Sequence, residues 1–230
     1  MPGNFDFDVI ARALPYLIRD GMSFTLTLTA TATVFGLALG ILIALLRLSS
    51  LPLLPRIAAG YVNVMRALPL VLVIFLFYFL MPYVGQWLLG TERPVEVGAV
   101  SSCIVTFTLF EAAYFSEIMR AGIQSIPRGQ VAAGKALGLT YAQIMGSVVL
   151  PQALRNMLPV ILTQTIVLFQ DTSLVYVLSI TDFLGAATKV AHRDGRLTEL
   201  YVFAALVYFV ISFAASTLVK RLQARLAPGH

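Results

Sequence analysis

Several ionisable and polar side chains interrupt otherwise apolar stretches, and their types suit the binding of a charged solute. Arg66 lies inside the run 57–82, and Glu111 lies inside the run 97–119. A third run, 156–180, holds four consecutive polar residues deep within it: Gln170, Asp171, Thr172 and Ser173. Ionisable groups at membrane depth are costly and usually face protein or water. These side chains are therefore the candidates for a polar passage.

Each candidate also has an ordinary structural role. A guanidinium can bind a carboxylate through two hydrogen bonds, so Arg66 could hold an acidic substrate. Alternatively, Arg66 pairs with Glu111, which lies at comparable depth. The stretch 171–173 either breaks its helix and lines a cavity or bonds back to that helix through its hydroxyls. Glu117 and Arg120 are three residues apart, which predicts a local ion pair.

Motifs for catalysis within the chain are missing from the sequence. No G-x-x-x-x-G-K-[ST] stretch occurs, so ATP is not expected to bind here in the usual way. No G-x-S-x-G elbow occurs. The histidines His192 and His230 cannot make a metal site with the one cysteine, Cys103. We expect no catalytic residue, no metal and no cofactor in this chain.

The stretch Gly129–Pro151 is polar enough to leave a membrane, and it lies between two long apolar runs. It begins with a helix of small residues that include Ala132, Ala133, Gly134 and Ala136, and it is bent or ended at Gly138. A second helical run follows, and Leu150 with Pro151 marks the point where a helix is interrupted or restarts. A helix with few bulky side chains can press its backbone into a groove of another protein. We interpret this segment as a cytoplasmic docking helix.

The composition predicts an integral membrane protein made of helices. Hydrophobic residues make up 59% of the chain and charged residues 12%, against about 25% charged in a soluble domain. A spanning helix needs about 20 mostly apolar residues. Five runs meet this need: 22–46, 57–82, 97–119, 156–180 and 197–219. The first contains Gly36 and Gly40 at a spacing that lets another helix approach closely.

Five spans put the two chain ends on opposite sides of the membrane, and the charges predict which side is which. One side collects a basic set with only Glu117 beside it: Arg47, Arg56, Arg120, Arg128, Lys135, Arg155, Lys220, Arg221 and Arg225. Because Lys and Arg favour the cytoplasm, this side is predicted to be inside. The N-terminus is then outside, and both the docking segment and the C-terminus are cytoplasmic. The net charge of +5 is explained by this border set, so nucleic acid is not an expected partner.

The outer side carries two further segments. Residues 5–20 have apolar side chains at helical spacing, which predicts a helix lying on the membrane surface, with a partly ordered tail as the alternative. Residues 181–196 are expected to form a polar loop, in which Lys189, His192 and Arg193 face a binding protein or solvent. The predicted organisation is a periplasmic amphipathic segment 1–21, a transmembrane domain 22–222 with a docking loop 126–151, and a cytoplasmic tail 223–230.

The docking loop resembles the one in permease subunits of ATP-binding-cassette importers, whose pattern is Glu-Ala-Ala, three residues, Gly, nine residues and Ile-x-Leu-Pro. Ala133 and Gly134 fall on the two Ala positions, and Ala132 replaces the Glu. The whole chain is similar to the polar amino-acid permeases, most of all to those of glutamate/aspartate importers. The residues that carry this likeness are 61–70, 110–118, 120–126 and 168–178. Many family members have Lys where this chain has Gln170.

This resemblance implies a type I importer permease in the bacterial inner membrane. It implies a second permease subunit, identical or related, two ATPases that bind ATP and Mg²⁺, and a periplasmic amino-acid-binding protein. The coupling contacts to the ATPases would then involve Gly129, Ala132, Ala133, Gly134, Gly138, Leu150 and Pro151. Glutamate or aspartate is the implied substrate. The alternatives are glutamine or a basic amino acid in the same architecture, or a channel-like membrane protein without an ATPase.

Overall fold

The computed structural model describes residues 5–226, and all regular structure in this range is helical. The helices run in chain order as follows: α1 (Phe7–Tyr16), the π-helical η1 (Leu17–Met22), α2 (Ser23–Arg47), α3 (Leu53–Ala67), α4 (Leu70–Leu89), α5 (Ala99–Gln124), α6 (Arg128–Ala136), α7 (Tyr141–Ile144), the π-helical η2 (Met145–Val149), α8 (Leu150–Asp171), the 3₁₀-helical η3 (Thr172–Leu178), α9 (Phe183–Asp194) and α10 (Leu197–Leu226).

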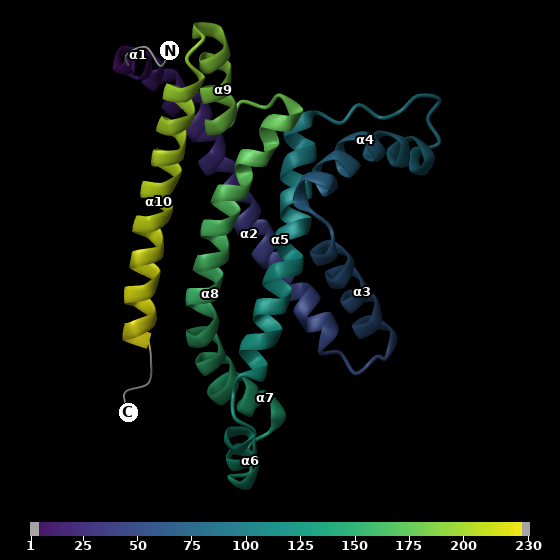
Figure 1. Cartoon of the computed structure of the whole chain (residues 1–230). Coiled ribbons are helices and arrows are strands. Elements are labelled where there is room, and N and C mark those ends of the chain that lie inside the picture. Colours follow the sequence, from purple (N-terminus) through teal and green to yellow (C-terminus); the bar gives the residue numbers. More distant parts are fainter. Residues whose placement is uncertain (1–4, 227–230) are drawn as a thin grey trace.

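The predicted all-α membrane fold is confirmed. Five helical stretches are long and apolar enough to cross a membrane: Phe7–Arg47, Leu70–Leu89, Ala99–Gln124, Tyr141–Leu178 and Leu197–Leu226. Helices α2, α5, α8 and α10 run along the length of the molecule, and the two ends of the chain lie at opposite ends of it (Figure 1). Helix α6 lies at the same end as the C-terminus, as five crossings require.

Helices α2 and α5 form the most extensive contact of the bundle, and small residues allow it. A Cβ built on Gly40 would lie 2.7 Å from the Cβ of Phe115, and one built on Gly36 would lie 3.1 Å from the Cβ of Glu111. Real Cβ atoms do not approach as closely as 2.7 Å, and a contact at 3.1 Å is unusually tight, so glycine at these two positions lets the backbones come together. The predicted packing role of these two glycines is confirmed, and their close contact fixes α5 as the central helix of the bundle.

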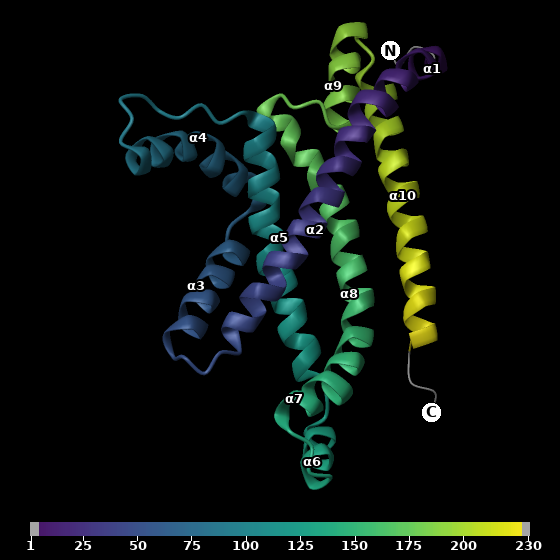
Figure 2. The same ribbon diagram turned by 180° about the vertical axis from the view of Figure 1, so that it is seen from behind.

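The predicted second span, 57–82, is wrong as a single helix. Helix α3 ends at Ala67, and α4 begins after Pro69. Leu68 between them is extended, with φ −98° and ψ 141°, as expected for a residue that precedes proline. The two helices point in different directions, and α4 lies across the long axis of the bundle (Figure 2). Arg66 therefore lies in the last turn of a helix rather than inside a continuous span.

The predicted polar loop 181–196 is also wrong, because most of it forms helix α9. Asp182 begins the helix by accepting hydrogen bonds from the backbone N–H groups of Leu184 at 3.1 Å and Gly185 at 2.9 Å. One face of α9 is buried in the outer part of the bundle, through Phe183, Ala186, Ala187, Val190 and Ala191. Lys189, His192 and Arg193 remain exposed on the other face.

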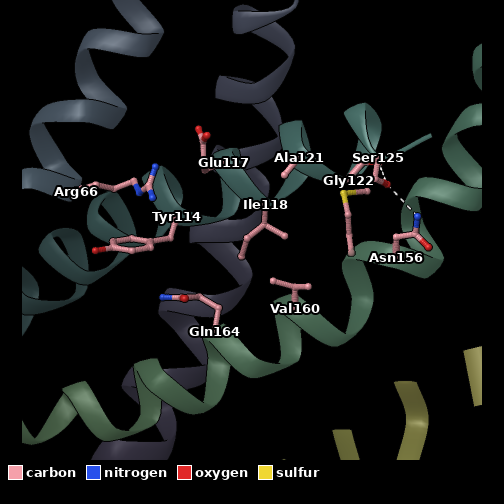
Figure 3. Close-up of a pocket in the computed structure, with 11 residues that line it drawn as sticks. Arg66, Tyr114, Glu117, Ile118, Ala121, Gly122, Ser125, Asn156, Val160 and Gln164 are labelled. Carbon is pink, nitrogen blue, oxygen red and sulfur yellow. Dashed lines mark hydrogen bonds between the residues drawn. The ribbon is translucent and has the colours of Figure 1, made fainter. Parts of the chain in front are cut away.

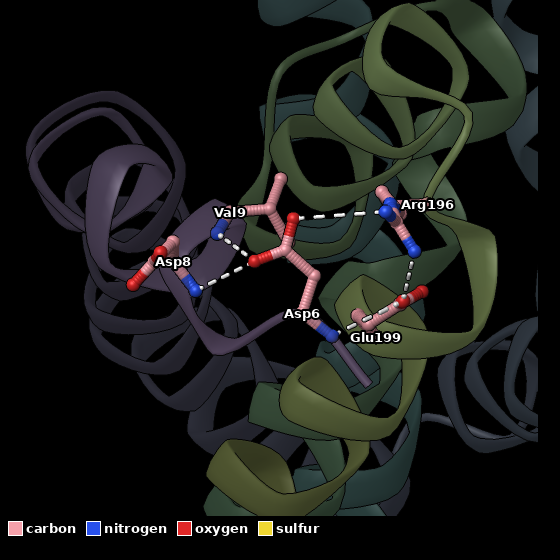
Figure 4. Close-up of polar contacts among 5 residues, drawn as sticks. All are labelled: Asp6, Asp8, Val9, Arg196 and Glu199. Atoms are coloured by element: carbon pink, nitrogen blue, oxygen red, sulfur yellow. Dashed lines mark hydrogen bonds and ion pairs between the residues drawn. The ribbon is translucent and has the colours of Figure 1, made fainter. Parts of the chain in front are cut away.

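The N-terminal segment is attached to the start of α10 by polar contacts (Figure 4). Asp6 Oδ1 caps α1 by accepting from Asp8 N at 2.9 Å and Val9 N at 3.3 Å. Asp6 Oδ2 lies 3.9 Å from Arg196 Nη2, and Arg196 Nη1 donates to Glu199 Oε1 at 3.2 Å. Residues 1–4 of the predicted segment 1–21 lie outside the described chain, as do residues 227–230 of the predicted tail; residues 223–226 belong to α10.

Candidate functional site

Arg66 points from the end of α3 toward α5 and lies against an aromatic ring. Its guanidinium carbon lies 5.6 Å from the centroid of the Tyr114 ring, which is within the range of a cation–π contact. Among residues 5–226, Arg66 forms no ion pair. The alternative role considered for Arg66, a pair with Glu111, is therefore not found. A guanidinium with an open hydrogen-bonding edge is free to take a ligand carboxylate.

Glu111 has a different partner, on helix α8. Its side chain is buried, and both carboxylate oxygens accept from Gln164 Nε2, at 3.3 and 3.1 Å. The amide thus links α5 to α8 in the interior of the bundle. Because the carboxylate lies behind Gln164, the amide of Gln164 rather than Glu111 lines the neighbouring pocket.

A pocket of about 370 Å³ lies between α3, α5 and α8 (Figure 3). Its polar lining consists of Arg66, Tyr114, Glu117, Ser125, Asn156 and Gln164. The rest of the wall is apolar or small: Ile118, Ala121, Gly122, Met157 and Val160. Asn156 Nδ2 donates to Ser125 Oγ at 2.9 Å, which joins α8 to the end of α5. A pocket with a mostly apolar wall and a few convergent polar groups is the usual form of a small-molecule site.

Glu117, the one carboxylate in the pocket wall, is held by two arginines. The predicted Glu117–Arg120 ion pair is present, and Arg47 from the end of α2 binds the other carboxylate oxygen. Arg120 Nη1 also donates to Gln124 Oε1 at 2.6 Å. The two arginines thus neutralise Glu117, and Arg66 is left as a cation of the pocket wall with no ion pair within residues 5–226. Such a guanidinium can bind an anionic group of a solute.

The four polar residues 170–173, at the end of α8 and the start of η3, lie in different surroundings. Helix α8 ends at Asp171 and continues as the 3₁₀-helical η3, so the helix changes type at the expected place. Thr172 is buried, and its hydroxyl bonds back to Phe169 O at 2.7 Å, which is the structural alternative. Gln170 and Ser173 line a second pocket, shared with Tyr208, Ser212 and Ser216 of α10. Neither residue lines the pocket that contains Arg66.

The predicted docking segment forms a compact unit at the end of the molecule that also holds the C-terminus. Helix α6 ends at Ala136, and Gly138 has φ +75°, a left-handed conformation that favours glycine. Thr140 then starts α7 through a capping box with Gln143. Leu150 and Pro151 open α8, so this proline restarts a helix rather than ending one.

Most of the predicted docking residues face outward. Ala132, Ala133 and Gly138 are exposed, as are Gly129, Leu150 and Pro151. Gly134 points inward instead, and a Cβ on it would lie 2.8 Å from Ile144 Cγ1. The exposed surface also includes Leu137 and Tyr141, whose exposed fractions are 80% and 73%. Two large apolar side chains at a protruding end are typical of an interface with another protein.

Sequence reasoning alone misses part of this pocket. It does not single out Gln164 and Ser125, because single amides and hydroxyls within apolar runs are common. It places Asn156 only at the start of a span. Asn156, Val160 and Gln164 follow one another at intervals of four residues, so they lie on one face of α8. This spacing is the sequence pattern that could have identified them as neighbours.

Comparison with known proteins settles the family. Residues 36–228 match the family model for the binding-protein-dependent transport system inner membrane component. The chain belongs to this family. It is a permease, a multi-pass component of the inner membrane, and ATP hydrolysis resides in a partner subunit. A permease of this family works with a binding protein, and the ATP hydrolysis in a partner subunit excludes the channel without an ATPase considered above.

Two relatives match this permease over nearly its full length. The glutamate/aspartate import permease protein GltK of Escherichia coli O6:H1 is 50% identical over 224 residues, which cover 97% of this chain and 99% of that protein. The probable glutamine transporter permease protein GlnP of Bacillus subtilis is 33% identical over 90% of this chain and 92% of that protein.

Solved structures agree with the fold of this permease. A crystal structure of an amino acid ABC transporter with histidines matches with a TM-score of 0.87 and 30% identity, covering 97% of this chain and 100% of that one. A structure of the MetNI methionine ABC transporter matches with a TM-score of 0.66 at 21% identity, over 90% of this chain and 96% of that one. The second likeness concerns the fold alone.

Proposed function

We propose that this chain is the transmembrane permease subunit of an ATP-driven importer of the acidic amino acids glutamate and aspartate. The observation that carries the proposal is the 50% identity to a glutamate/aspartate permease along almost the full length of both chains. The guanidinium of Arg66, which forms no ion pair within residues 5–226, supports the same substrate class, because an acidic amino acid brings a second carboxylate for it to bind.

In this proposal, the substrate passes between α3, α5 and α8. Arg66 binds a substrate carboxylate, and the neutral groups of Gln164, Asn156 and Ser125 offer hydrogen bonds to the rest of the amino acid. Glu111 orients Gln164 from behind. The other predicted passage residues, Gln170, Asp171, Thr172 and Ser173, lie where α8 passes into η3. They are outside the pocket of Arg66, so the solute would meet them at a different stage of the passage.

The assembly would contain a second permease subunit, two ATPases and a periplasmic amino-acid-binding protein. The docking unit α6–α7 meets an ATPase, and its exposed small residues, with Leu137 and Tyr141, form the contact. Closure of the ATPases on ATP would then move this unit and switch the passage between inward-open and outward-open forms.

Uptake by the whole transporter tests the substrate class. Liposomes holding the complete complex and its binding protein would receive labelled glutamate, aspartate, glutamine or arginine, with and without ATP inside. ATP-dependent uptake of glutamate and aspartate is the expected result. Uptake of only glutamine, as the likeness to the Bacillus subtilis protein allows, or of only arginine, would refute the acidic substrate.

A further inference from the structure

The half of α10 that leads to the C-terminus stands away from the rest of the bundle. The buried residues of this helix are Glu199, Leu200, Ala204 and Ser212, and no residue of the stretch 213–226 is buried. A second pocket, of about 430 Å³, lies between this half of α10 and the first turns of α8. Both helices reach the end of the molecule that carries the docking unit (Figure 1).

This pocket uses a different face of α8 from the one proposed for the substrate. Arg155, Pro159 and Thr163 follow one another at intervals of four residues and line the pocket beside α10. The next residue in each case lines the proposed substrate pocket, and Asn156 and Val160 line both. The pocket between α8 and α10 therefore has side chains of its own that no step of the proposed passage uses.

Arg155 is the one charged side chain among the described residues of this pocket wall. It is exposed, and it forms no ion pair within residues 5–226. Lys220, Arg221 and Arg225 lie on the turns of α10 that carry Gln223, which also lines the pocket. These three basic residues form no ion pair in the same range either.

The chain brings no free carboxylate to this group of cations. Its sequence has no acidic residue between Glu117 and Asp171, and none after Glu199. Glu117 is already bound by two arginines. A second copy of the chain would bring the same single acidic side chain to this side, so it would offer Arg155 no anion. The anion that neutralises this pocket must come from another kind of molecule.

The pocket lies where the headgroups of the inner leaflet are expected. Arg155 and the basic residues of α10 belong to the set that marks the predicted cytoplasmic border. Pro159, Val160 and Leu226 give the pocket an apolar wall. On the same two helices, Leu154 and Leu218 are 55% and 64% exposed. The surroundings thus combine an unpaired guanidinium with apolar surface, as a phospholipid does with opposite charge.

We propose that the pocket between α8 and α10 binds the headgroup of an anionic phospholipid of the inner leaflet. The guanidinium of Arg155 can donate to two phosphate oxygens at once, and the amide of Gln223 can donate to the same group. Basic pockets between spanning helices on the cytoplasmic side bind anionic headgroups in this way. Because Asn156 and Val160 line both pockets, the lipid would join α10 to the helix that carries the passage.

Native mass spectrometry of the complete transporter tests the site by counting retained phosphatidylglycerol molecules. Arg155→Gln removes the guanidinium. Arg56→Gln is the matched control, because Arg56 is also an exposed arginine of the predicted cytoplasmic border without an ion pair in the described chain. The wild type should retain one more phosphatidylglycerol per copy of this permease than Arg155→Gln does, and as many as Arg56→Gln. With phosphatidylcholine the three proteins should retain equal numbers.

Three results would overturn the proposal. Equal retention by the wild type and Arg155→Gln would show that the pocket holds no lipid or is covered by another subunit. An equal loss in Arg56→Gln would show diffuse attraction to a basic surface. Inorganic phosphate, added at the concentration of the lipid, should leave the bound phosphatidylglycerol in place, and its release would show a site for free phosphate instead.

Labelling of the unaltered protein keeps the test independent of how Arg155→Gln folds. Phosphatidylglycerol with a diazirine at the start of one acyl chain would be mixed into liposomes that hold the wild-type complex. After illumination it should label the segments 150–163 and 213–226 several-fold more than a phosphatidylcholine probe does. Equal labelling by the two probes would also refute the site. None of these outcomes depends on which amino acid is imported, so the proposed function is tested separately.

Discussion

Three carboxylates of this permease have hydrogen-bonding or charged partners, whereas Arg66 has no ion pair within residues 5–226. Glu111 is bound by Gln164, and Glu117 is bound by two arginines. Asp182 is bound by the backbone at the start of α9. Arg66, in contrast, has an aromatic neighbour and no ion pair within the described chain. Because Arg66 lies in a pocket wall, we expect selectivity to depend on it.

Asp182 should make the stability of the permease depend on pH. Burial raises the pKa of this carboxyl from 3.8 to about 6, against the opposing effect of the backbone hydrogen bonds from Gly185 and Leu184. The folded protein therefore holds this proton more tightly than the unfolded chain. The resulting stabilisation is full below pH 3.8 and is lost as the pH rises through about 6. Between pH 7 and pH 5 the gain from this group is about 1 kcal/mol.

The Asp182→Asn variant isolates this contribution, since Asn keeps an oxygen that can cap α9 and cannot titrate. Thermal unfolding in detergent would be followed at pH 5 and pH 7 for both proteins. The wild type should gain more stability at pH 5 than the variant does. Equal shifts in the two proteins would show that Asp182 does not titrate in this range.

At the scale of elements, the docking unit depends on a close contact between α6 and α7. Gly134 is buried against Ile144, while a Cβ built on Gly129 in the same helix would have no atom within 4 Å among the described residues. The contact orients the exposed face of α6 toward a partner. A side chain at position 134 would separate the two helices and change that orientation.

Gly134→Val should therefore uncouple the transporter. Overpacking of this kind costs about 1–3 kcal/mol, enough to displace a small two-helix unit. We expect the variant complex to lose ATPase subunits during purification, or to retain them and lose ATP-driven uptake. Gly146→Ala, at a position where a Cβ would meet no atom within 4 Å among the described residues, is the matched control and should behave as the wild type does. Normal uptake by the Gly134→Val complex would contradict the docking role of α6.

The elements are predictable where periodicity and length agree and are missed where they do not. The spans 22–46 and 197–219 correspond closely to α2 and to most of α10. The run 57–82 looks continuous because membrane helices often tolerate proline, so Pro69 alone cannot indicate a break. Helix α9 has a signal, since Phe183, Ala186 and Val190 recur at helical spacing after a capping Asp182, but its charged residues suggest a loop.

At the scale of the whole molecule, one helical bundle holds the pocket between α3, α5 and α8 and carries the docking unit at one end. Arg66 can be identified from the sequence, because an arginine in an apolar run is rare. Gln164 cannot, because its contact with Glu111 joins residues 53 positions apart and depends on how α5 meets α8. Local pattern thus reveals the charged member of the site, while the neutral members require the tertiary structure.

The most direct test of this account measures how much glutamate is imported per ATP hydrolysed by complexes with Arg66→Ala. A charge-assisted hydrogen bond contributes about 1.5–3 kcal/mol, which corresponds to roughly a tenfold to hundredfold change. The variant should import at least about tenfold less glutamate per ATP, while the loaded binding protein still stimulates hydrolysis. Arg56→Ala, an exposed arginine on the same helix, should match the wild type. Wild-type import by Arg66→Ala would contradict a passage through this pocket.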